Sequence, residues 1–556
     1  MKQIHSTPTT PFATIIDQVI NDAFPPSVLK FASKGIPEVY ALRILETPLV
    51  YLLNERRAQE RLTGDTPEEQ YLHFLEDRIN ASTELQERFP NHWKRWQQVK
   101  KCLIETINDV TRCAVEDTAA ISELLHGSAH SEPPAIVSIK PLGDVHPQGM
   151  VCEVVTSLGT MYYKPRSASN EIFLSALAAW MSEKAGSYPW LKLWFPQVAD
   201  CGDHTWVAPV QHGSLENRAA ASRYYRRAGQ LLGVAYLVNL TDLHHENIIA
   251  TATQPVPVDL ETIMSVLPRV PEDQPDAFNT TLRQTTSSPA STGLIPLGTS
   301  FKELGGDISG LAANGLRARH RALDRQGRSD MRYIHTIAEI TLVNHLPTLE
   351  NNPILAANYV DEIVEDFVLT LQIAMKHRND LETFICNNAS NLHVRVLTRM
   401  SNDYATVLAG LSRVGHNTNP EQLFSILRRN SVGLAESMVN SKEEQLRTWA
   451  VSHFWAIASE TTIRDPWGRP TGRLHVAPIA QTTAKIRAIT ETDINRHISL
   501  IRMAFHKPEE VILPLGPRLA TQDAGSFEEF EQIHFDALQA QTVTGADGSV
   551  NWPSRG

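Results

Sequence analysis

Acidic and amide side chains in the stretch Thr241–Glu261 have spacings that suit phosphoryl transfer. Asp242 and Asn247 are five residues apart, and Asp259 and Glu261 follow after a short apolar run. In such a site a carboxylate receives the proton of the attacking hydroxyl, and an amide oxygen helps to hold a metal ion on the phosphates. Asp242 is therefore the candidate base. Asn247, Asp259 and Glu261 form a set of hard oxygen ligands of the kind that magnesium prefers.

The spacing of Asp242 and Asn247 matches D-L-x-x-x-N, the catalytic loop of protein kinases. Asp259 stands where a kinase carries the metal-binding aspartate of its D-F-G triplet, but the triplet here reads Asp-Leu-Glu. His244 and His245 are adjacent, so one of them could orient Asp242 or meet substrate while the other is structural. Neither histidine has further ligands at zinc spacing. The stretch predicts a kinase-like site with an altered metal triplet.

Lys164 ends a predicted strand 78 residues before Asp242, where the N-lobe of a kinase carries its phosphate-binding lysine. A cation there neutralises charge on ATP while the γ-phosphoryl group moves. Taken alone, Lys164 is better explained as a solvated lysine at a strand end. Its place between a glycine-turned hairpin and the catalytic-loop spacing makes the two interpretations about equal. The segment Gly143–Gly149 is bounded by glycines but is not a G-x-G-x-x-G loop, and a plain β-turn is the alternative. Asp144 would repel phosphates, so it suits a proton-handling or structural role.

The predicted elements follow the order of a kinase N-lobe and C-lobe. Apolar periodicity and turn residues predict strands and one helix in the first half of the chain: strands at Val151–Val155, Met161–Lys164, Val198–Asp200 and Thr205–Val210, and a helix at Ser169–Lys184. We divide the chain into an N-terminal helical region (1–127), a kinase-like N-lobe with the catalytic loop (128–265), an activation-type loop (266–320), a helical C-lobe or elaboration (321–506) and a partly disordered tail (507–556).

Composition narrows the classes of function. The chain has 556 residues, which predicts more than one domain, and its net charge of −11 argues against a general nucleic-acid or anionic-membrane binder. The longest apolar run, Gly229–Leu240, is too short to span a membrane and predicts a buried helix. Five scattered cysteines suggest neither a disulfide framework nor a zinc site, and the N-terminus has no signal-peptide pattern. We expect a cytoplasmic protein without stable membrane insertion.

These motifs together resemble the dehydratase domain of class II lanthipeptide synthetases (LanM type). The resemblance covers roughly residues 30–505 in order, and the combination is specific although no single motif is. It is carried by Tyr162–Ser167, Asp242-x-His244-x-x-Asn247, Asp259-Leu260-Glu261, Gly143-Asp144-x-His146, Ser291–Pro296, Asp307–Leu311 and Arg395-x-x-x-Arg399-x-Ser401.

The resemblance implies an α+β fold with a lipid-kinase-like, bilobal catalytic core and large helical elaborations. Such domains use ATP and Mg²⁺ to phosphorylate Ser and Thr of a ribosomally made precursor peptide (leader plus core), and then eliminate phosphate to leave a dehydroamino acid. By position, Lys164 would bind ATP phosphates, Asp242 would be the base and His244 would support it. Asn247, Asp259 and Glu261 would belong to the metal and phosphate region. The implied elimination residues are Asp144, His146, Arg395 and Ser401.

The sequence departs from the family in two places. Ser401 stands where the family has threonine, and the family's D-I-P-Y-F box reads Ala450-Val451-Ser452-His453-Phe454, with only Phe454 retained. No cysteine follows Cys386, and only about fifty residues follow Phe505. We therefore expect no zinc-dependent cyclase in this sequence, and a separate cyclase would be a partner. The alternatives are a peptide or small-molecule kinase without elimination, and a non-catalytic module that binds a leader peptide.

Overall fold

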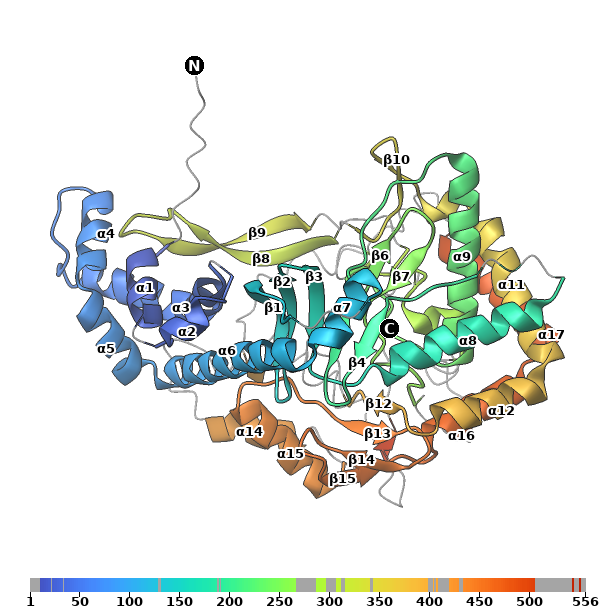
Figure 1. The fold of residues 1–556 in the computed structure, drawn as a ribbon. Helices are drawn as coiled ribbons and strands as arrows, with labels where there is room; N and C mark the ends of the chain where they lie inside the picture. The colour runs from blue at the N-terminus through green and yellow to red at the C-terminus, as the bar shows by residue number, and fades with distance from the viewer. Residues whose placement is uncertain are drawn as a thin grey trace, which may run out of the picture.

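The structure is a computed structural model in which helices and strands are mixed (Figure 1). It describes residues 11–21, 23–33, 35–128, 132–187, 190, 192–266, 287–296, 307–311, 316–340, 344–398, 404, 407–408, 420–429, 434–505, 543–544 and 550–551. No helix within these ranges combines the length and the apolar character that a membrane span needs. The predicted tail, residues 507–556, lies almost entirely outside the described residues.

The N-terminal part is helical, as the sequence predicts. Its longest helix, α6, buries Trp96, Val99, Leu103, Ile107 and Val110, whose spacing of three and four residues places them on one face. The bounds are α1 (Ala13–Asn21), α2 (Pro26–Leu29), α3 (Ile36–Ala58), α4 (Pro67–Glu76), α5 (Arg78–Arg88), α6 (Pro90–Glu116) and α7 (Thr118–His126). Trp96 is fully buried in the core of this part.

An antiparallel sheet in the order β1-β2-β3-β5-β4 follows these helices, and the apolar face of α6 shares a hydrophobic core with it (Figure 1). The strands are β1 (Ile136–His146), β2 (Gly149–Thr156), β3 (Gly159–Lys164), β4 (Val198–Asp200) and β5 (Thr205–Val207). All the predicted strands are confirmed. The segment predicted as a loop before Gly149 is different: β1 continues to His146, which pairs with Gly149 across a tight turn.

Helix α8 (Ser169–Ala185) follows β3. In the C-terminal part of the chain, here called the C-terminal body, α9 (Arg218–Leu237) packs against α11 (Val360–Lys376). Two glycines allow the close approach of α9 and α11. A Cβ atom at Gly229 would lie 2.2 Å from the carbonyl oxygen of Ile363, and one at Gly233 would lie 2.6 Å from Cβ of Thr370. The sequence correctly predicts a buried helix here, because the apolar run forms the second half of α9 and is covered by α11.

The prediction of a helical region at 321–506 is wrong in part, because strands interrupt it. Strands β8 (Leu316–Asp324) and β9 (Arg332–Ile340) form a long hairpin. A separate four-stranded sheet has the order β12-β13-β14-β15. The sheet strands are His393–Arg395, Trp455–Ile457, Thr462–Arg464 and Pro470–Arg473, and the helices are α12 (Arg378–Ala389), α14 (Pro420–Arg429), α15 (Glu436–Arg447), α16 (Pro478–Ala488) and α17 (Glu491–Phe505). Strands of three or four residues carry too little periodicity to be recognised in the sequence.

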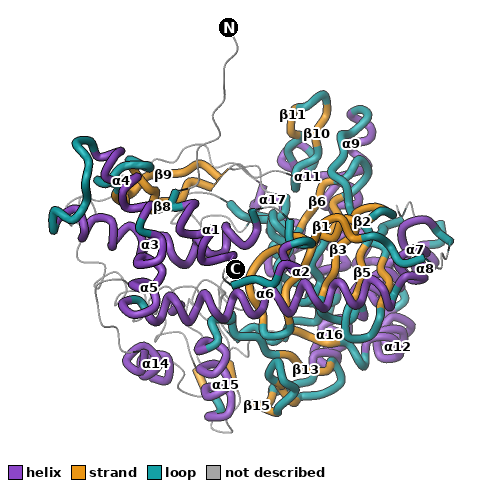
Figure 2. Tube along the Cα trace, turned by 60° about the vertical axis from the view of Figure 1, so that its left-hand side comes forward, coloured by secondary structure: helices purple, strands orange, loops and turns teal. Residues whose placement is uncertain are grey.

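The hairpin β8–β9 extends from the C-terminal body to the N-terminal helices (Figure 1; Figure 2 shows the same arrangement from another side). At its tip, the main-chain N–H of Ser329 donates to the carbonyl of Pro67 (2.8 Å), and the hydroxyl of Tyr333 donates to Glu46 (2.8 Å). The remaining short elements are β6 (Ile248–Ala250), β7 (Pro255–Pro257), β10 (Thr348–Leu349), β11 (Asn352–Pro353), β16 (Val543–Thr544), β17 (Val550–Asn551), η1 (Pro289–Thr292) and η3 (Ala356–Asn358).

His204, beside β5, is enclosed by two carboxylates and a thiol. Its Nε2 lies 2.6 Å from Asp117, its Nδ1 lies 2.6 Å from Asp203, and Cys113 Sγ is 4.0 Å away. Ligand atoms of Cys113, Asp117 and His204 all lie within 4.8 Å of one another, although the sequence spacing does not suggest a metal site. Since each ring nitrogen already faces a carboxylate, the cluster is best described as an ion pair.

This ion pair predicts a pH-dependent contribution to stability. Burial lowers the pKa of His204, but the hydrogen bonds with Asp117 and Asp203 outweigh burial and raise the pKa above its usual value. The stabilisation is therefore fully present below the ordinary histidine pKa and is lost as pH rises through the raised one. We expect His204→Gln to lower the free energy of unfolding by about 1–3 kcal/mol at pH 6 and by less at pH 9. Chemical unfolding at both pH values measures this difference, and an equal loss at both would contradict it.

Candidate functional site

The predicted catalytic loop, which follows α9 and contains Asp242 and Asn247, is held by two segments that are distant in the sequence. The main-chain N–H of Leu243 donates to Thr292 (2.8 Å), and that of His245 donates to Ile308 (2.9 Å). Gly310 lies so close to the loop that a Cβ atom there would be 2.4 Å from the carbonyl oxygen of Leu243. The conformation of the loop is thus imposed by residues 291–296 and 307–311, two of the motifs that carry the family resemblance.

Asp242 projects from this loop with its side chain 48% exposed and its backbone in the left-handed region (φ 65°). Asp tolerates this conformation better than most residues, and such backbone is common at functional sites. Asn247 fixes the loop from inside, because its Nδ2 donates to the carbonyl oxygen of Asp242 at 2.9 Å. The predicted base and the predicted amide ligand are therefore adjacent and share a hydrogen bond.

His244 accompanies Asp242. Its Nδ1 accepts from the main-chain N–H of Glu246 (3.2 Å), and its Nε2 lies 3.3 Å from Nδ2 of Asn247. Nε2 lies 3.5 Å from Oδ1 of Asp242, at the long end of an ion-pair contact. His245 points elsewhere, with its Nδ1 3.1 Å from the carbonyl oxygen of Ile308. The two histidines thus divide as the sequence predicts: His244 faces the candidate base and His245 is structural.

Lys164 is not a solvated strand-end lysine. Only 9% of its surface is exposed, and Nζ donates to the carbonyl oxygen of Val258 (2.6 Å) and to Glu171 (3.3 Å). Glu171 lies in the first turn of α8, where it also accepts two hydrogen bonds from Arg166 (2.8 and 3.1 Å). Burial acts to raise the pKa of Glu171, but Arg166 and Lys164 outweigh burial and lower it to about 2. The pair has the form of the strand-lysine and helix-glutamate pair that positions phosphate-binding lysines in kinases.

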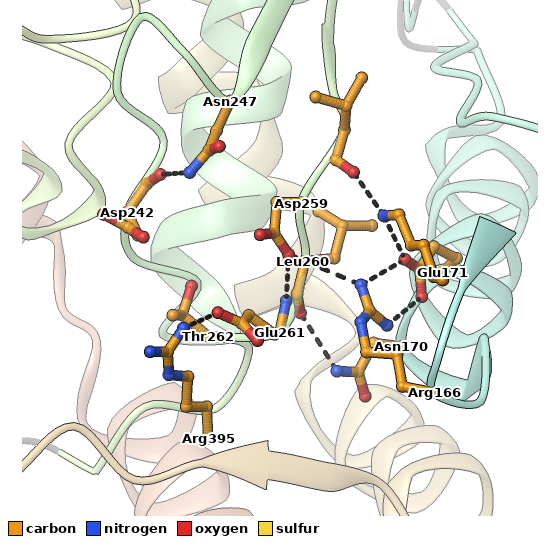
Figure 3. A network of polar contacts seen from close by, with 12 residues as sticks. Arg166, Asn170, Glu171, Asp242, Asn247, Asp259, Leu260, Glu261, Thr262 and Arg395 are labelled. Atoms are coloured by element: carbon orange, nitrogen blue, oxygen red, sulfur yellow. Dashed lines mark hydrogen bonds and ion pairs between the residues drawn. The ribbon is translucent and has the colours of Figure 1, made fainter. Parts of the chain in front are cut away.

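The triplet Asp259-Leu260-Glu261 forms polar contacts with residues on both of its sides (Figure 3). On one side Arg166 reaches Asp259 (3.5 Å), and Asn170 donates to the carbonyl oxygen of Leu260 (3.1 Å). On the other side the guanidinium of Arg395, a residue of β12, forms an ion pair with Glu261. The main-chain N–H of Arg395 also donates to the carbonyl oxygen of Glu261 (3.2 Å). Arg395 is far away in the sequence, yet it belongs to the same site as Asp242 and Asp259.

The pKa of Asp242 is raised above its usual value. Desolvation by the surrounding protein is the largest cause, Asp259 adds to it, and His244 and Arg395 oppose it. A carboxylate with a raised pKa accepts a proton more readily than a free one, which favours a role as general base. Asp259 and Arg395 also act on Asp242, so the phosphorylation and elimination candidates share one electrostatic environment.

The donor atoms of the site fit a magnesium ion at two of the three predicted ligands. The carboxylate of Asp259 is 41% exposed, and its contacts, with the N–H of Glu261 (3.3 Å) and with Arg166 (3.5 Å), are long. Because Nδ2 of Asn247 is used by the loop, Oδ1 remains as its ligand atom (Figure 3). The carboxylate of Glu261 is instead engaged by Arg395. Asp259 and Asn247 are therefore the better magnesium ligands, and Glu261 is better suited to positioning Arg395.

The remaining predicted elimination residues are only partly described. His146 ends β1, and its ring centroid lies 6.5 Å from that of His453. The side chain of Asp144 and the whole of Ser401 lie outside the described residues. His146 also lines a cavity of about 360 Å³ between α6, the β1–β2 turn and Ala450. The altered box Ala450–Phe454 is thus a neighbour of the predicted elimination residues.

Sequence reasoning missed Glu171 and Asn170 and assigned no role to Arg166. Glu171 begins a helix seven residues after Lys164, and that spacing after a lysine strand is a usable signal. Asn170 carries no such signal, since its two acceptors, the carbonyl oxygens of Leu260 and His393, are brought to it only by the fold.

Removing the charge of Glu171 should impair both stability and phosphoryl transfer. Glu171→Gln leaves Lys164 and Arg166 as adjacent cations at a site where the glutamate side chain is 3% exposed, and breaking such a pair costs about 3–5 kcal/mol. We expect a lower melting temperature and at least about a tenfold loss of kcat/KM for ATP, which corresponds to about 1.4 kcal/mol. Glu183→Gln, at an exposed position of the same helix, is the matched control. Equal behaviour of the two variants would rule out this role.

Comparison with known proteins agrees with these features. Residues 89–452 match the family described as "Domain of unknown function (DUF4135)". The chain is also 25% identical over 527 residues to "Lacticin 481/lactococcin biosynthesis protein LcnDR2" of Lactococcus lactis subsp. lactis, an alignment that covers 91% of this chain and 57% of the relative. The chain thus spans a little over half the length of this curated relative. It belongs to the DUF4135 family found in LanM-type proteins, and its predicted resemblance to LanM-type lanthipeptide synthetases is confirmed.

Proposed function

We propose that this protein dehydrates Ser and Thr residues of a ribosomally made precursor peptide, by phosphorylation with ATP and Mg²⁺ followed by elimination of phosphate, on a kinase-like catalytic core. The observation that carries the proposal is the ion pair between Glu261 and Arg395. It joins the group that suits phosphoryl transfer (Lys164, Asp242, Asn247, Asp259) to a guanidinium that suits a departing phosphate. The name of the curated relative, a lacticin 481/lactococcin biosynthesis protein, supports a role in lanthipeptide biosynthesis.

In the first step the carboxylate of Asp242 accepts the proton of the peptide hydroxyl as the oxygen attacks the γ-phosphorus. The new P–O bond forms while the bond to the β-phosphate oxygen breaks, and ADP leaves with that electron pair. Lys164, held by Glu171, contacts the phosphates, and Asp259 and Asn247 would hold Mg²⁺, which supplies charge neutralisation. His244 orients the carboxylate of Asp242 from 3.5 Å.

In the second step the phosphorylated side chain loses its Cα proton to a base, and the C–H electron pair becomes the Cα=Cβ double bond. The Cβ–O bond breaks and phosphate leaves with its electron pair. Arg395 is placed to receive it, because a guanidinium binds two phosphate oxygens at once. Phosphate is a far better leaving group than hydroxide, which explains why one site would first add the phosphoryl group and then remove it.

The decisive experiment is incubation of the protein with ATP, Mg²⁺ and a candidate precursor peptide, a short Ser/Thr/Cys-rich peptide sought among the neighbouring genes, followed by mass spectrometry. The proposal requires the loss of one water for each modified Ser or Thr. Phosphopeptide that persists with the unmodified protein would select a kinase without elimination. The absence of ATP binding in calorimetry, together with tight peptide binding, would select a leader-binding partner.

A further inference from the structure

His453 lies two residues before β13, in the segment that pairs with the strand of Arg395. Arg395 is opposite Trp455, and the ladder continues by one step, with the N–H of Val396 donating to the carbonyl oxygen of Phe454 (2.8 Å). Residues two apart on a strand share a face. The register therefore places His453 on the same face as Trp455, diagonal to Arg395, within reach of a group that binds to the guanidinium.

The main chain of His453 is fixed, but its ring has an unused nitrogen. Gln445, from α15, accepts the N–H of His453 (2.7 Å) and donates to its carbonyl oxygen (3.3 Å). Nε2 of His453 is buried without a hydrogen-bond partner, and so is Nε of Arg395. Buried polar atoms are normally paired, and pairs that are missing in the free protein mark places where a ligand supplies the partner. Here both such atoms belong to side chains on one face of one sheet.

The surroundings of His453 favour the neutral form of its ring. Burial is the main cause that lowers its pKa well below the usual value, and the positive charges of Arg395, from β12, and His146, from β1, lower it further. A neutral imidazole has a lone pair that can accept a proton, and the adjacent guanidinium stabilises negative charge that develops beside it. His146 connects this place to the cavity near Ala450, because it lines that cavity and its ring meets the ring of His453.

We propose that His453 is the base that removes the Cα proton of the phosphorylated residue, a role that rests on the proposed dehydratase function. Nε2 takes the proton, the C–H electron pair forms the Cα=Cβ double bond, and the Cβ–O pair leaves with phosphate to Arg395. The imidazolium then returns the proton to the phosphate or to water. The D-I-P-Y-F box of related domains has tyrosine at this position, so the base would be a feature of this chain.

The test separates elimination from phosphorylation. The substrate for elimination is the candidate precursor peptide that the wild-type protein modifies, synthesised with one phosphoserine in its core. Phosphorylation is followed separately with the unmodified peptide, ATP and Mg²⁺. We expect His453→Gln to release phosphate from the phosphoserine peptide at least a hundredfold more slowly, and to phosphorylate unmodified peptide within about threefold of the wild-type rate. His212→Gln, at an exposed position, should match the wild type in both assays.

The pH profile distinguishes a base from a residue that only supports the fold. Wild-type elimination should be independent of pH around neutrality and decrease only in acid. The residual rate of His453→Gln should lose that acidic limb and increase with hydroxide. Wild-type rates and pH dependence in His453→Gln would overturn the role of His453, as would an equal loss of phosphorylation and elimination. Failure of the wild-type protein to release phosphate would instead overturn the elimination half of the proposed function.

Discussion

Asp242→Asn is expected to abolish modification of the precursor peptide, leaving neither phosphopeptide nor dehydrated product. The amide keeps the size of the side chain and the left-handed backbone at this position, which Asn also adopts, but it cannot accept the proton of the attacking hydroxyl. General base catalysis contributes about a hundred- to ten-thousandfold to rate, so phosphorylation should fall by that factor. Mass spectrometry of peptide incubated with ATP and Mg²⁺ measures both products at once.

Two controls make this result specific. Asp361→Asn changes an exposed carboxylate that pairs only with Arg502 at the surface, and it should modify peptide at the wild-type rate. In addition, Asp242→Asn should still release phosphate from a peptide that already carries phosphoserine, because Asp242 acts before the phosphoryl group is attached. If Asp242→Asn dehydrated unmodified peptide normally, Asp242 would not be the base and the assignment of the catalytic loop would be wrong.

The local parts of the site could be predicted from the sequence because their signals are local. Asp242 and Asn247 share one short loop, and their hydrogen bond follows from a spacing of five residues. Lys164 could be located because it ends a strand in a hairpin with clear alternation. Asn170, by contrast, acts through carbonyl oxygens of residues 260 and 393, and no spacing in the sequence predicts contacts that exist only after the chain has folded.

The fold, too, could be predicted where the sequence carries a local signal and not where an element depends on distant contacts. The edges of α8 and β4 are close to their predicted positions, and for β4 the turn Cys201-Gly202-Asp203 marks its end in the sequence. Strands β12 to β15 were missed because each has only three or four residues and gains its stability from pairing, not from a pattern of its own. Without these strands the sequence could not show that Arg395 lies beside the altered box Ala450–Phe454. The two are neighbours only because β12 pairs with β13.

Arg395→Ala is expected to convert the protein into one that accumulates phosphopeptide. The guanidinium side chain is 12% exposed and pairs with Glu261, so its removal takes away the group that would receive the departing phosphate while Asp242, Lys164 and Asn247 remain in place. Loss of one preorganised donor for developing negative charge slows a reaction by about a hundred- to a thousandfold. Phosphorylation should continue within a few-fold of the wild-type rate. Time-resolved mass spectrometry should therefore show phosphate on the peptide with little loss of water.

Arg395→Lys separates the charge of the side chain from its shape, because it keeps the positive charge and removes the planar guanidinium. A lysine can neutralise Glu261 but cannot bind two phosphate oxygens in parallel, so elimination should remain slow even if the ion pair is restored. Arg502→Ala removes an arginine from a surface ion pair and should leave both steps unchanged. Elimination at the wild-type rate in both variants of Arg395 would separate the guanidinium from phosphate release. The Glu261–Arg395 pair would then hold β12 against the triplet Asp259-Leu260-Glu261, and the leaving phosphate would have to be received elsewhere.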